Sequence, residues 1–423
     1  MKVVPWRILL ALLIAVCVGL LARDHVDGWQ LTLYRILDLG AQVYLSALRM
    51  LVIPLVGIAI LHSFIEARGG LGLGRLAART FFYYAFTALG AGCLGLVIVN
   101  TLLPMLTATM ATPVTGEHLA GAITSKALVL SGDPWQAVAD ILTNLVPTNI
   151  INAAAQGNML GIIFFSMLLG YALLRLPKTA TTSFSLIDDL FLAVLQMTRL
   201  ISVAMPVGVI FLVGRSVASG GLAQIGSLLI FAGIVLLALA LFACVILPII
   251  LLARGIHPLR LVKIMWPALI AAFSTSSGAA ALPVTIHCLT AGGIPNRVVS
   301  FVAPLGTTFN MTGSGLYECV AALFIAQLYG LHLPLSHQIL VVALSLLTSM
   351  GMAGVASSSL IAIVVDINLM GLPIEAATFL LPVERLLEMA RTTTNVFSDA
   401  CCCALVAREE AGEPPALLPA EQA

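Results

Sequence analysis

The sequence predicts an all-α integral membrane protein. Of its 423 residues, 60% are hydrophobic and only 9% are charged, whereas a soluble globular domain carries about 25% charged residues. Several apolar runs reach the length of about 20 residues that a helix needs to cross the hydrocarbon core. These runs lack the period-two alternation of barrel strands. Because a chain in lipid must satisfy its own backbone polar groups, we expect the runs to be helices.

Other protein classes are excluded by the same composition. The net charge is +1, with 20 basic and 19 acidic residues, so no basic surface for nucleic acid is expected. The apolar content is too high for a disordered chain. Of the eight cysteines, Cys401, Cys402 and Cys403 are adjacent and have no metal-ligand spacing. We therefore expect neither a disulfide framework nor a zinc site, and no organic cofactor.

Six segments are predicted to span the membrane: 6–22, 44–64, 81–103, 158–174, 190–214 and 228–253. The first follows Lys2 and Arg7 and is similar to a signal peptide, but the many later spans favour a retained helix. The stretch 104–157 is more polar and is expected to be an external excursion with short helices. Residues 409–423 are expected to form a disordered tail.

The distribution of basic residues in the loops predicts the orientation. A cytoplasmic N-terminus places most of the basic loop residues inside the cell, in agreement with the positive-inside rule. The opposite side holds only Arg23, Arg35, Lys126 and Arg215. The sequence therefore predicts cytoplasmic termini in an inner or plasma membrane, with lipid as the surrounding partner.

The last third of the chain contains broken apolar runs. Segments 264–273 and 282–289 are each too short to span, and Ser and Gly residues separate them at 274–279. The pattern recurs with 339–347, a Ser/Gly/Ala patch at 349–359, and 360–369. Paired interrupted segments are typical of transporter binding sites. We expect two re-entrant hairpins; ordinary helices with flexible centres, or helical hairpins outside the bilayer, are the alternatives.

A polar, glycine-containing break also interrupts the apolar segment 298–329, at residues 307–314. Such a break frees carbonyl oxygens that suit Na⁺, and it exposes a helix N-terminus that suits an anion. Ser, Thr and Gly are also common in ordinary helix packing.

The final segment, 381–399, carries a polar stripe. Successive stripe residues are spaced by four, three, one, three and four positions, which places them on one helix face. The stripe consists of Glu384, Glu388, Arg391, Thr392, Asn395 and Asp399. Ionisable groups inside membrane segments are costly and indicate function; a surface amphipathic helix is the alternative.

The residue types of the stripe indicate their chemistry. Arg391 offers a planar fork of donors for a carboxylate, and Glu388 suits a substrate ammonium group. The alternative for these two is an internal i,i+3 ion pair. Asp399 and Asn395 supply hard oxygens for Na⁺, and Asn310 is placed to complete that site.

The sequence resembles the dicarboxylate/amino acid:cation symporters, the glutamate transporter family. The resemblance covers most of the chain and rests on motifs in a fixed order. These are Met50-Leu-Val-Ile-Pro-Leu-Val56, Val146-Pro-Thr-Asn149, Gly157-Asn158, Met205-Pro-Val-Gly208, Ala272-Phe-Ser-Thr-Ser-Ser277, Leu282-Pro-Val-Thr285, Pro304-Leu-Gly306, Asn310-Met-Thr-Gly-Ser314, Ala353-Gly-Val355 and Arg391-Thr-Thr-Thr-Asn-Val396.

The resemblance implies eight transmembrane helices plus two re-entrant helical hairpins, in a homotrimer that works by an elevator mechanism. Scaffold helices 1 and 2 would fall in residues 1–80, and scaffold helices 4 and 5 with the external excursion in 107–220. The transport domain would comprise helix 3 in 81–106 and residues 221–408, which hold helices 6, 7 and 8 with both hairpins. The implied setting is the bacterial inner membrane.

The resemblance also implies the site residues. The substrate site would use Ser276, Ser277, Gly278, Ser314, Gly354, Val355, Glu388, Arg391, Thr392 and Asn395. One sodium site would use Gly306, Asn310, Asn395 and Asp399. A second, weakened sodium site would use Tyr84, Thr87 and Thr312, and a backbone sodium site would use Thr308, Ser349 and Met350.

The chain departs from the family pattern at several positions. Thr312 stands where the family has Asp, and Ala88 stands where it has Ser, so the second sodium site loses two ligands. The family's three-serine run becomes Ser277-Gly278-Ala279, its amino-group Asp becomes Glu388, and the Pro of the second tip becomes Ala356.

These observations predict a symporter, not an enzyme, that takes up glutamate or aspartate with Na⁺. Proton coupling is an alternative, because desolvation in a dry pocket favours the neutral form of a carboxyl. A C4-dicarboxylate or a neutral amino acid is an alternative substrate. An anion channel, or an intramembrane hydrolase using Ser277 with His287, belongs to another class, and His287 is a poor base for it because it lies beyond the hairpin tip.

Overall fold

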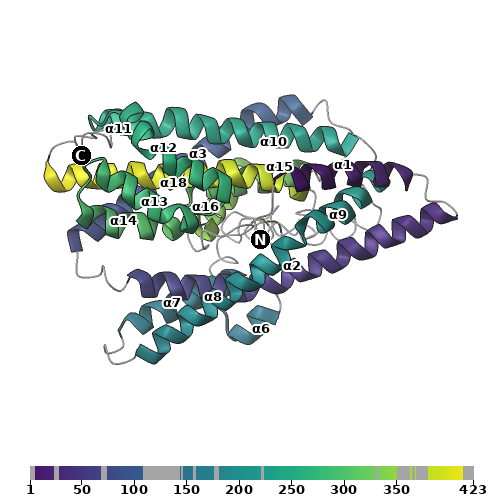
Figure 1. The fold of residues 1–423 in the computed structure, drawn as a ribbon, viewed down its shortest axis with the longest axis horizontal. Helices are drawn as coiled ribbons and strands as arrows, with labels where there is room; N and C mark the ends of the chain where they lie inside the picture. The colour runs from purple at the N-terminus through teal and green to yellow at the C-terminus, as the bar shows by residue number, and fades with distance from the viewer. Residues whose placement is uncertain are drawn as a thin grey trace.

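The structure is a computed structural model (Figure 1). It describes residues 5–22, 28–67, 74–107, 143, 146–155, 159–175, 181–220, 223–328, 331, 333–349, 363, 367 and 380–412. Every secondary-structure element within these ranges is a helix, and they contain no strand. The all-α prediction is confirmed for this part of the chain.

The helices follow the apolar runs of the sequence. In order they are α1 (Pro5–Leu21), α2 (Trp29–Ala67), α3 (Gly74–Thr107), α6 (Ile150–Ala155), α7 (Met159–Leu174), α8 (Thr181–Val203), α9 (Met205–Gly220), α10 (Ala223–Leu241), η2 (Phe242–Ile246), α11 (Leu247–Ala253), α12 (Pro258–Thr275), α13 (Gly278–Ala291), α14 (Asn296–Phe309), α15 (Thr312–Leu328), α16 (Leu335–Ser349) and α18 (Leu381–Ala411). Several of them extend beyond the segments predicted from hydropathy.

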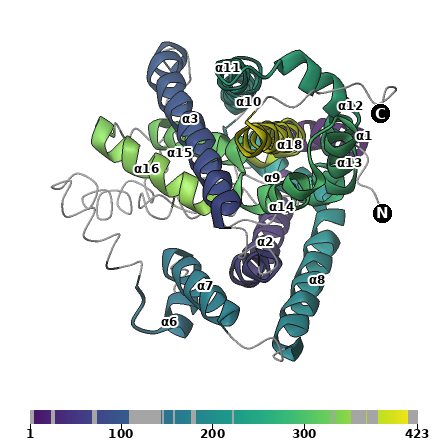
Figure 2. The same ribbon diagram turned by 90° about the vertical axis from the view of Figure 1, so that its left-hand side faces the viewer.

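The helices contact one another in two groups. In the first group, α2 packs against α7, α8 and α9, and α1 packs against α9. In the second group, α18 contacts α3, α10, α12, α13, α14 and α15. Figure 2 views α18 end-on, with those helices around it. The second group therefore encloses the helix that carries the predicted polar stripe.

One predicted span is wrong. The segment 190–214 is not a single helix, because α8 ends at Val203 and α9 begins at Met205. Pro206 has no backbone N–H to donate to the preceding turn. The chain therefore turns at Ala204, whose N–H donates to Ile201, and a new helix begins there.

The predicted span 228–253 is continuous but irregular. A π-helical turn, η2, connects α10 to α11 without a break. Pro248 lies just after this turn and cannot donate a helical hydrogen bond, and proline is a common cause of such local irregularity. The whole stretch Gly226–Ala253 is one of three described helical stretches long and apolar enough to cross a membrane; the others are Gly74–Leu102 and Asn296–Leu328.

Where the structure describes them, the apolar segments of the last third are interrupted at the predicted positions, and their re-entry into the membrane stays a prediction. Helices α12 and α13 form a hairpin whose tip lies at Ser276 and Ser277, between the two helices. Helices α14 and α15 are separated by Asn310 and Met311, which are not helical. The tip of the second predicted hairpin, including Met350, Gly354 and Val355, lies outside the described residues.

The end of α18 differs from the prediction. The helix continues to Ala411, so Glu409 and Glu410 are helical and do not belong to a disordered tail. Both side chains pair with Arg79 of α3, and Glu409 also pairs with Arg254 after α11. These contacts fix the end of α18 to its neighbours.

Candidate functional site

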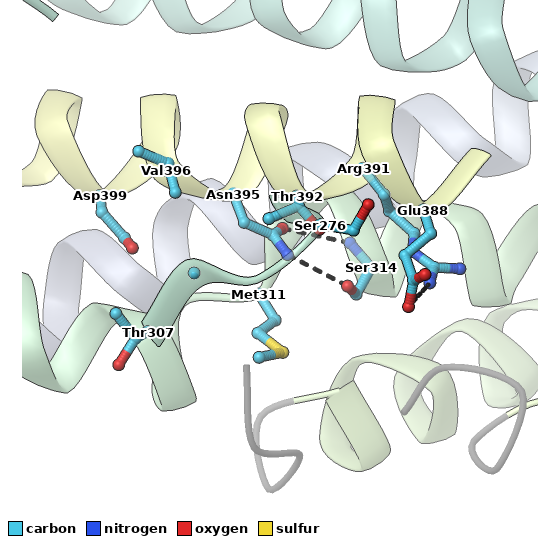
Figure 3. A pocket seen from close by; sticks show the side chains of 11 residues that line it. Ser276, Thr307, Met311, Ser314, Glu388, Arg391, Thr392, Asn395, Val396 and Asp399 are labelled. Atoms are coloured by element: carbon cyan, nitrogen blue, oxygen red, sulfur yellow. Dashed lines mark hydrogen bonds and ion pairs between the residues drawn. The ribbon is translucent and has the colours of Figure 1, made fainter. Parts of the chain in front are cut away.

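A polar pocket lies where the broken helices meet the stripe of α18 (Figure 3). It is lined by Ser276, Gly278, Thr307, Met311, Ser314, Glu388, Arg391, Thr392, Asn395, Val396 and Asp399. Its cavity volume is about 20 Å³, which is room for a water molecule. An amino acid would therefore need a wider form of this pocket.

Arg391 is the buried cation of the pocket, only 2% exposed. Its Nη2 lies 3.0 Å from Glu384 Oε1 and 3.9 Å from Glu388 Oε1. The guanidinium also stacks on the Tyr317 ring, with its carbon 4.4 Å from the ring centroid, and the Tyr317 hydroxyl donates to Glu384 Oε2. Arg391 Nη1 has no hydrogen-bond partner among the described residues. One donor of this fork is thus left for another group.

Glu388 has a different close partner from the one that the sequence suggests. Arg385 Nη1 donates to Glu388 Oε2 at 2.7 Å, and the two residues are one helical turn apart. The predicted i,i+3 alternative, a pair between Glu388 and Arg391, exists only as the longer 3.9 Å contact. Glu388 is 2% exposed, so this carboxylate is paired inside the protein.

The N-terminal ends of two helices face the pocket. Gly278 begins α13, and the Ser277 hydroxyl caps that helix by accepting from Ala280 N. Asn395 Oδ1 accepts from Gly313 N at 2.8 Å and Ser314 N at 3.2 Å, at the start of α15. Helix N-termini attract anions, so this end of the pocket suits a carboxylate.

The hairpin tip bends at Ser276, which has a left-handed backbone with φ of 50°. A non-glycine residue in this conformation is uncommon and can indicate a functional constraint. The Ser276 hydroxyl is buried and has no hydrogen-bond partner among the described residues. It lines the pocket together with Gly278, as the resemblance implies for the first hairpin.

Asp399 lies at the other end of the pocket, next to the break between α14 and α15. Asn310 Nδ2 donates to Asp399 Oδ1 at 2.9 Å, and Thr87 Oγ1 donates to Asn310 Oδ1 at 3.1 Å. Asp399 is 3% exposed, and no basic side chain pairs with it within the described ranges. A buried carboxylate needs a compensating cation or a proton.

The Asp399 carboxylate is a hard ligand for a small cation, and the Asn310 side-chain oxygen, which accepts from Thr87 in this conformation, would have to turn toward Asp399 to join it. A Cβ added at Gly306 would overlap the Asp399 carboxylate, so the backbone of Gly306 lies close to it. Asn395, however, uses its side-chain oxygen to cap α15, and that oxygen is therefore not free for a cation in this conformation.

The weakened sodium site is only partly assembled. Thr87 contacts Asn310, but the Tyr84 hydroxyl donates instead to Val302 O at 2.5 Å. Thr312 is buried, and its hydroxyl has no hydrogen-bond partner in the described part of the chain. The group therefore contains neutral ligands only.

Thr308 and Ser349, two of the three residues implied for a backbone sodium site, are not among the residues that line the pocket. Thr308 is buried in α14, and Ser349 at the end of α16 donates its hydroxyl to Leu346 O. The third residue, Met350, is outside the described residues. This site remains a prediction.

Sequence reasoning missed two groups at the site. Tyr317 holds Glu384 across 67 positions of the chain, and no local pattern reveals that contact. Arg385 lies three residues before Glu388, and this spacing of opposite charges on a helix could have revealed it.

A polar pocket formed by broken membrane helices, with buried charges and helix ends facing it, defines the class of secondary transporters. Comparison of the sequence narrows this class. The chain belongs to the sodium:dicarboxylate symporter family, whose model matches residues 4–409.

Among its relatives, the proton/glutamate-aspartate symporter of Escherichia coli (strain K12) is 32% identical over 414 residues, which cover 96% of this chain and 92% of the relative. The proton/sodium-glutamate symport protein of Bacillus subtilis (strain 168) is 31% identical, covering 88% and 86%. The C4-dicarboxylate transport protein of Rhizobium leguminosarum is 26% identical, covering 88% and 84%. The chain is thus a membrane transporter by family.

Proposed function

We propose that this protein is a secondary active symporter that takes up glutamate or aspartate together with a cation. The observation that carries the proposal is Arg391, a buried guanidinium with one unpartnered nitrogen in a pocket that two helix N-termini face. An unmet buried donor is unfavourable, and a carboxylate satisfies it with a charge-assisted hydrogen bond.

Two parts of the pocket suit the two carboxylates of an acidic amino acid. Arg391 would bind the side-chain carboxylate, and the amides at the start of α13 would bind the α-carboxylate. Ser276, Ser314, Thr392 and Asn395 would supply further hydrogen bonds, and Glu388 would hold the ammonium group. Gly354 and Val355 of the second hairpin tip would cover the substrate.

For the coupling ion we propose Na⁺, bound by Asp399 with Asn310 and the backbone of Gly306. The support is a buried carboxylate that lies beside the Asn310 side chain and the backbone of Gly306, with no basic partner in the described residues. The ligands Tyr84, Thr87 and Thr312 carry no charge, so we expect fewer than the family's usual number of sodium ions.

Proton coupling is the second candidate. It is favoured by the neutral Thr312 and by the relative named a proton/glutamate-aspartate symporter. In that case Asp399 or another buried carboxyl would carry the proton instead of facing Na⁺.

Uptake of labelled L-aspartate into proteoliposomes tests both points. We expect accumulation with an inward Na⁺ gradient, its loss in Arg391→Cys, and its retention in Arg215→Gln, which changes a half-exposed arginine of α9. Normal transport by Arg391→Cys would contradict the substrate assignment. Accumulation that follows a pH gradient in the absence of Na⁺ would show that the coupling ion is a proton and not sodium.

We also propose that the two helix groups are a scaffold and a moving transport domain, in a homotrimer of the bacterial inner membrane with both termini cytoplasmic. The support is that α18 and the broken helices pack mainly with one another, whereas α1, α2, α7, α8 and α9 pack together. A cross-link between α2 and α14, which touch across the groups, should stop transport without preventing substrate binding. Native mass spectrometry tests the trimer.

A further inference from the structure

Arg385 is a charged residue of α18 to which nothing above assigns a role in transport. It lies one turn before Glu388, and its Nη1 contacts Glu388 Oε2 at 2.7 Å. The side chain of Glu388 is 3% exposed and that of Arg385 is 16% exposed. Glu388 lines the pocket, whereas Arg385 is not among the described lining residues. The close pair therefore joins a residue of the pocket wall to a residue outside the lining.

Arg385 and Arg391 each make their shorter contact with a different carboxylate of α18. Arg391 lies 3.0 Å from Glu384 but 3.9 Å from Glu388, so its shorter contact is with Glu384. The shorter contact of Glu388 is with Arg385. In this conformation the negative charge of Glu388 is thus already compensated by a cation of the protein itself.

We propose that Arg385 is a specificity-determining residue that occupies the place of a substrate ammonium group on Glu388. The inference rests on the proposed function, in which Glu388 holds the amino group of an acidic amino acid. An incoming ammonium must then take Glu388 Oε2 from Arg385 or share it. When the amino acid leaves, the guanidinium returns, and the buried carboxylate is never unpaired.

The same pair discriminates between substrate classes. A C4-dicarboxylate has no ammonium, so it leaves the contact between Arg385 and Glu388 intact and still satisfies Arg391 Nη1. An amino acid must displace a charge-assisted hydrogen bond first. Arg385 therefore lowers the affinity for amino acids relative to dicarboxylates of the same length, and its removal should raise the affinity for amino acids relative to dicarboxylates.

The test measures dissociation constants of L-aspartate and succinate for the purified full-length protein, by isothermal titration calorimetry. In Arg385→Met we expect the ratio of aspartate to succinate affinity to rise about tenfold, because one charge-assisted hydrogen bond no longer competes with the ammonium. Arg385→Lys keeps the positive charge and should keep a ratio close to that of the wild type. Arg254→Met removes an arginine at the end of α11, 42% exposed, and should change neither constant.

Each outcome decides the assignment. An unchanged ratio in Arg385→Met, with both ligands bound by the wild type, overturns the role of Arg385 and leaves the proposed function standing. A wild-type protein that binds neither ligand overturns the proposed substrate class and this inference together. If Arg385→Met does not fold, Arg385→Gln removes the charge while keeping a polar side chain, and it is judged by the same ratio.

Discussion

The two helix groups differ in what they bury. The group around α18 shares one large core, and every residue from Thr312 to Ala326 of α15 is buried in it. Among the described residues, the group of α1, α2, α7, α8 and α9 shows small clusters between α1, α2 and α9. Its helix α8 exposes large side chains such as Leu186, Leu192 and Leu200. Both groups expose apolar side chains, and the first group differs because it is packed around buried ionisable residues.

The difference between the two groups shows where this chain, which has few charged residues, places its buried ionisable side chains. Buried ionisable residues such as Glu384, Glu388, Arg391 and Asp399 lie within the densely packed group. Isolated buried charges are unfavourable, so a tightly packed setting with fixed partners is required to hold them. In the other group, glycines allow helices to pack closely: Gly40 of α2 faces the Phe211 ring and Gly208 of α9 faces the Tyr44 ring, and small residues at helix contacts are typical of membrane helices.

The largest expected effect comes from breaking the buried pair of the dense group. Glu384→Gln removes the carboxylate that Arg391 and Tyr317 bind. Removal of one partner of a buried ion pair costs about 3–5 kcal/mol, so the thermal unfolding midpoint in detergent should fall markedly. Asp38→Asn is the matched change in the other group, where Asp38 pairs with the half-exposed Arg215. It should cost about 0–1 kcal/mol, and an equal fall in both variants would refute the contrast.

The second effect tests the close helix contacts of the group that contains α2 and α9. A Cβ at Gly208 of α9 would lie 2.5 Å from the Tyr44 ring of α2. Gly208→Ala should therefore destabilise the contact by about 1–3 kcal/mol, as overpacking does, and lower the thermal midpoint. Gly233→Ala in α10 meets no atom within 4 Å and should not destabilise. A midpoint unchanged in Gly208→Ala would mean that α2 and α9 can move apart freely.

The third effect concerns function more than stability. Gly306→Ala would push a methyl group against the Asp399 carboxylate. We expect the sodium concentration for half-maximal aspartate uptake to rise at least about tenfold, equivalent to about 1.4 kcal/mol. In the control Gly90→Ala, the added Cβ meets only Ile246 at 3.8 Å, so sodium dependence should be unchanged. Unaltered sodium dependence in Gly306→Ala would remove Asp399 from the proposed cation site.

The smallest effect is expected at the end of α18. Glu410→Gln removes one ion pair with Arg79, but Arg79 keeps its contacts with Glu409. Partly exposed pairs contribute about 0–1 kcal/mol, and salt screens them. The thermal midpoint should therefore drop slightly at low ionic strength and match the wild type in high salt. A large drop of the thermal midpoint that persists in high salt would show that the pair between Glu410 and Arg79 is as strong as a buried ion pair.

Sequence reasoning reached furthest where the pattern is local. The break at 307–314 and the hairpin tip near Ser276 are where the sequence predicts them, because Gly and polar residues interrupt apolar runs at those points. The stripe of α18 follows from helical spacing alone. The single span at 190–214 was wrong, because hydropathy counts Pro206 as one residue among many and does not register its missing N–H.

It was harder to predict from the sequence which ionisable side chains of α18 pair with each other. From spacing, Glu388 and Arg391 form the obvious pair, yet Arg391 lies closer to Glu384 and Glu388 lies closer to Arg385. Helical spacing permits several pairs at once, and side-chain packing selects among them. Tyr317 decides this choice, since its hydroxyl and ring hold Glu384 and Arg391 from another helix.

The sequence by itself determined that this is a helical membrane protein with its ionisable residues concentrated on one late helix. Hydropathy and helical periodicity are properties of neighbouring residues, and a single chain displays them. Only the tertiary structure decided that α3, α14 and α15 close around that helix, that Asp399 faces Asn310, and that Arg391 keeps a free donor. These contacts join residues tens to hundreds of positions apart, and their geometry depends on packing between helices.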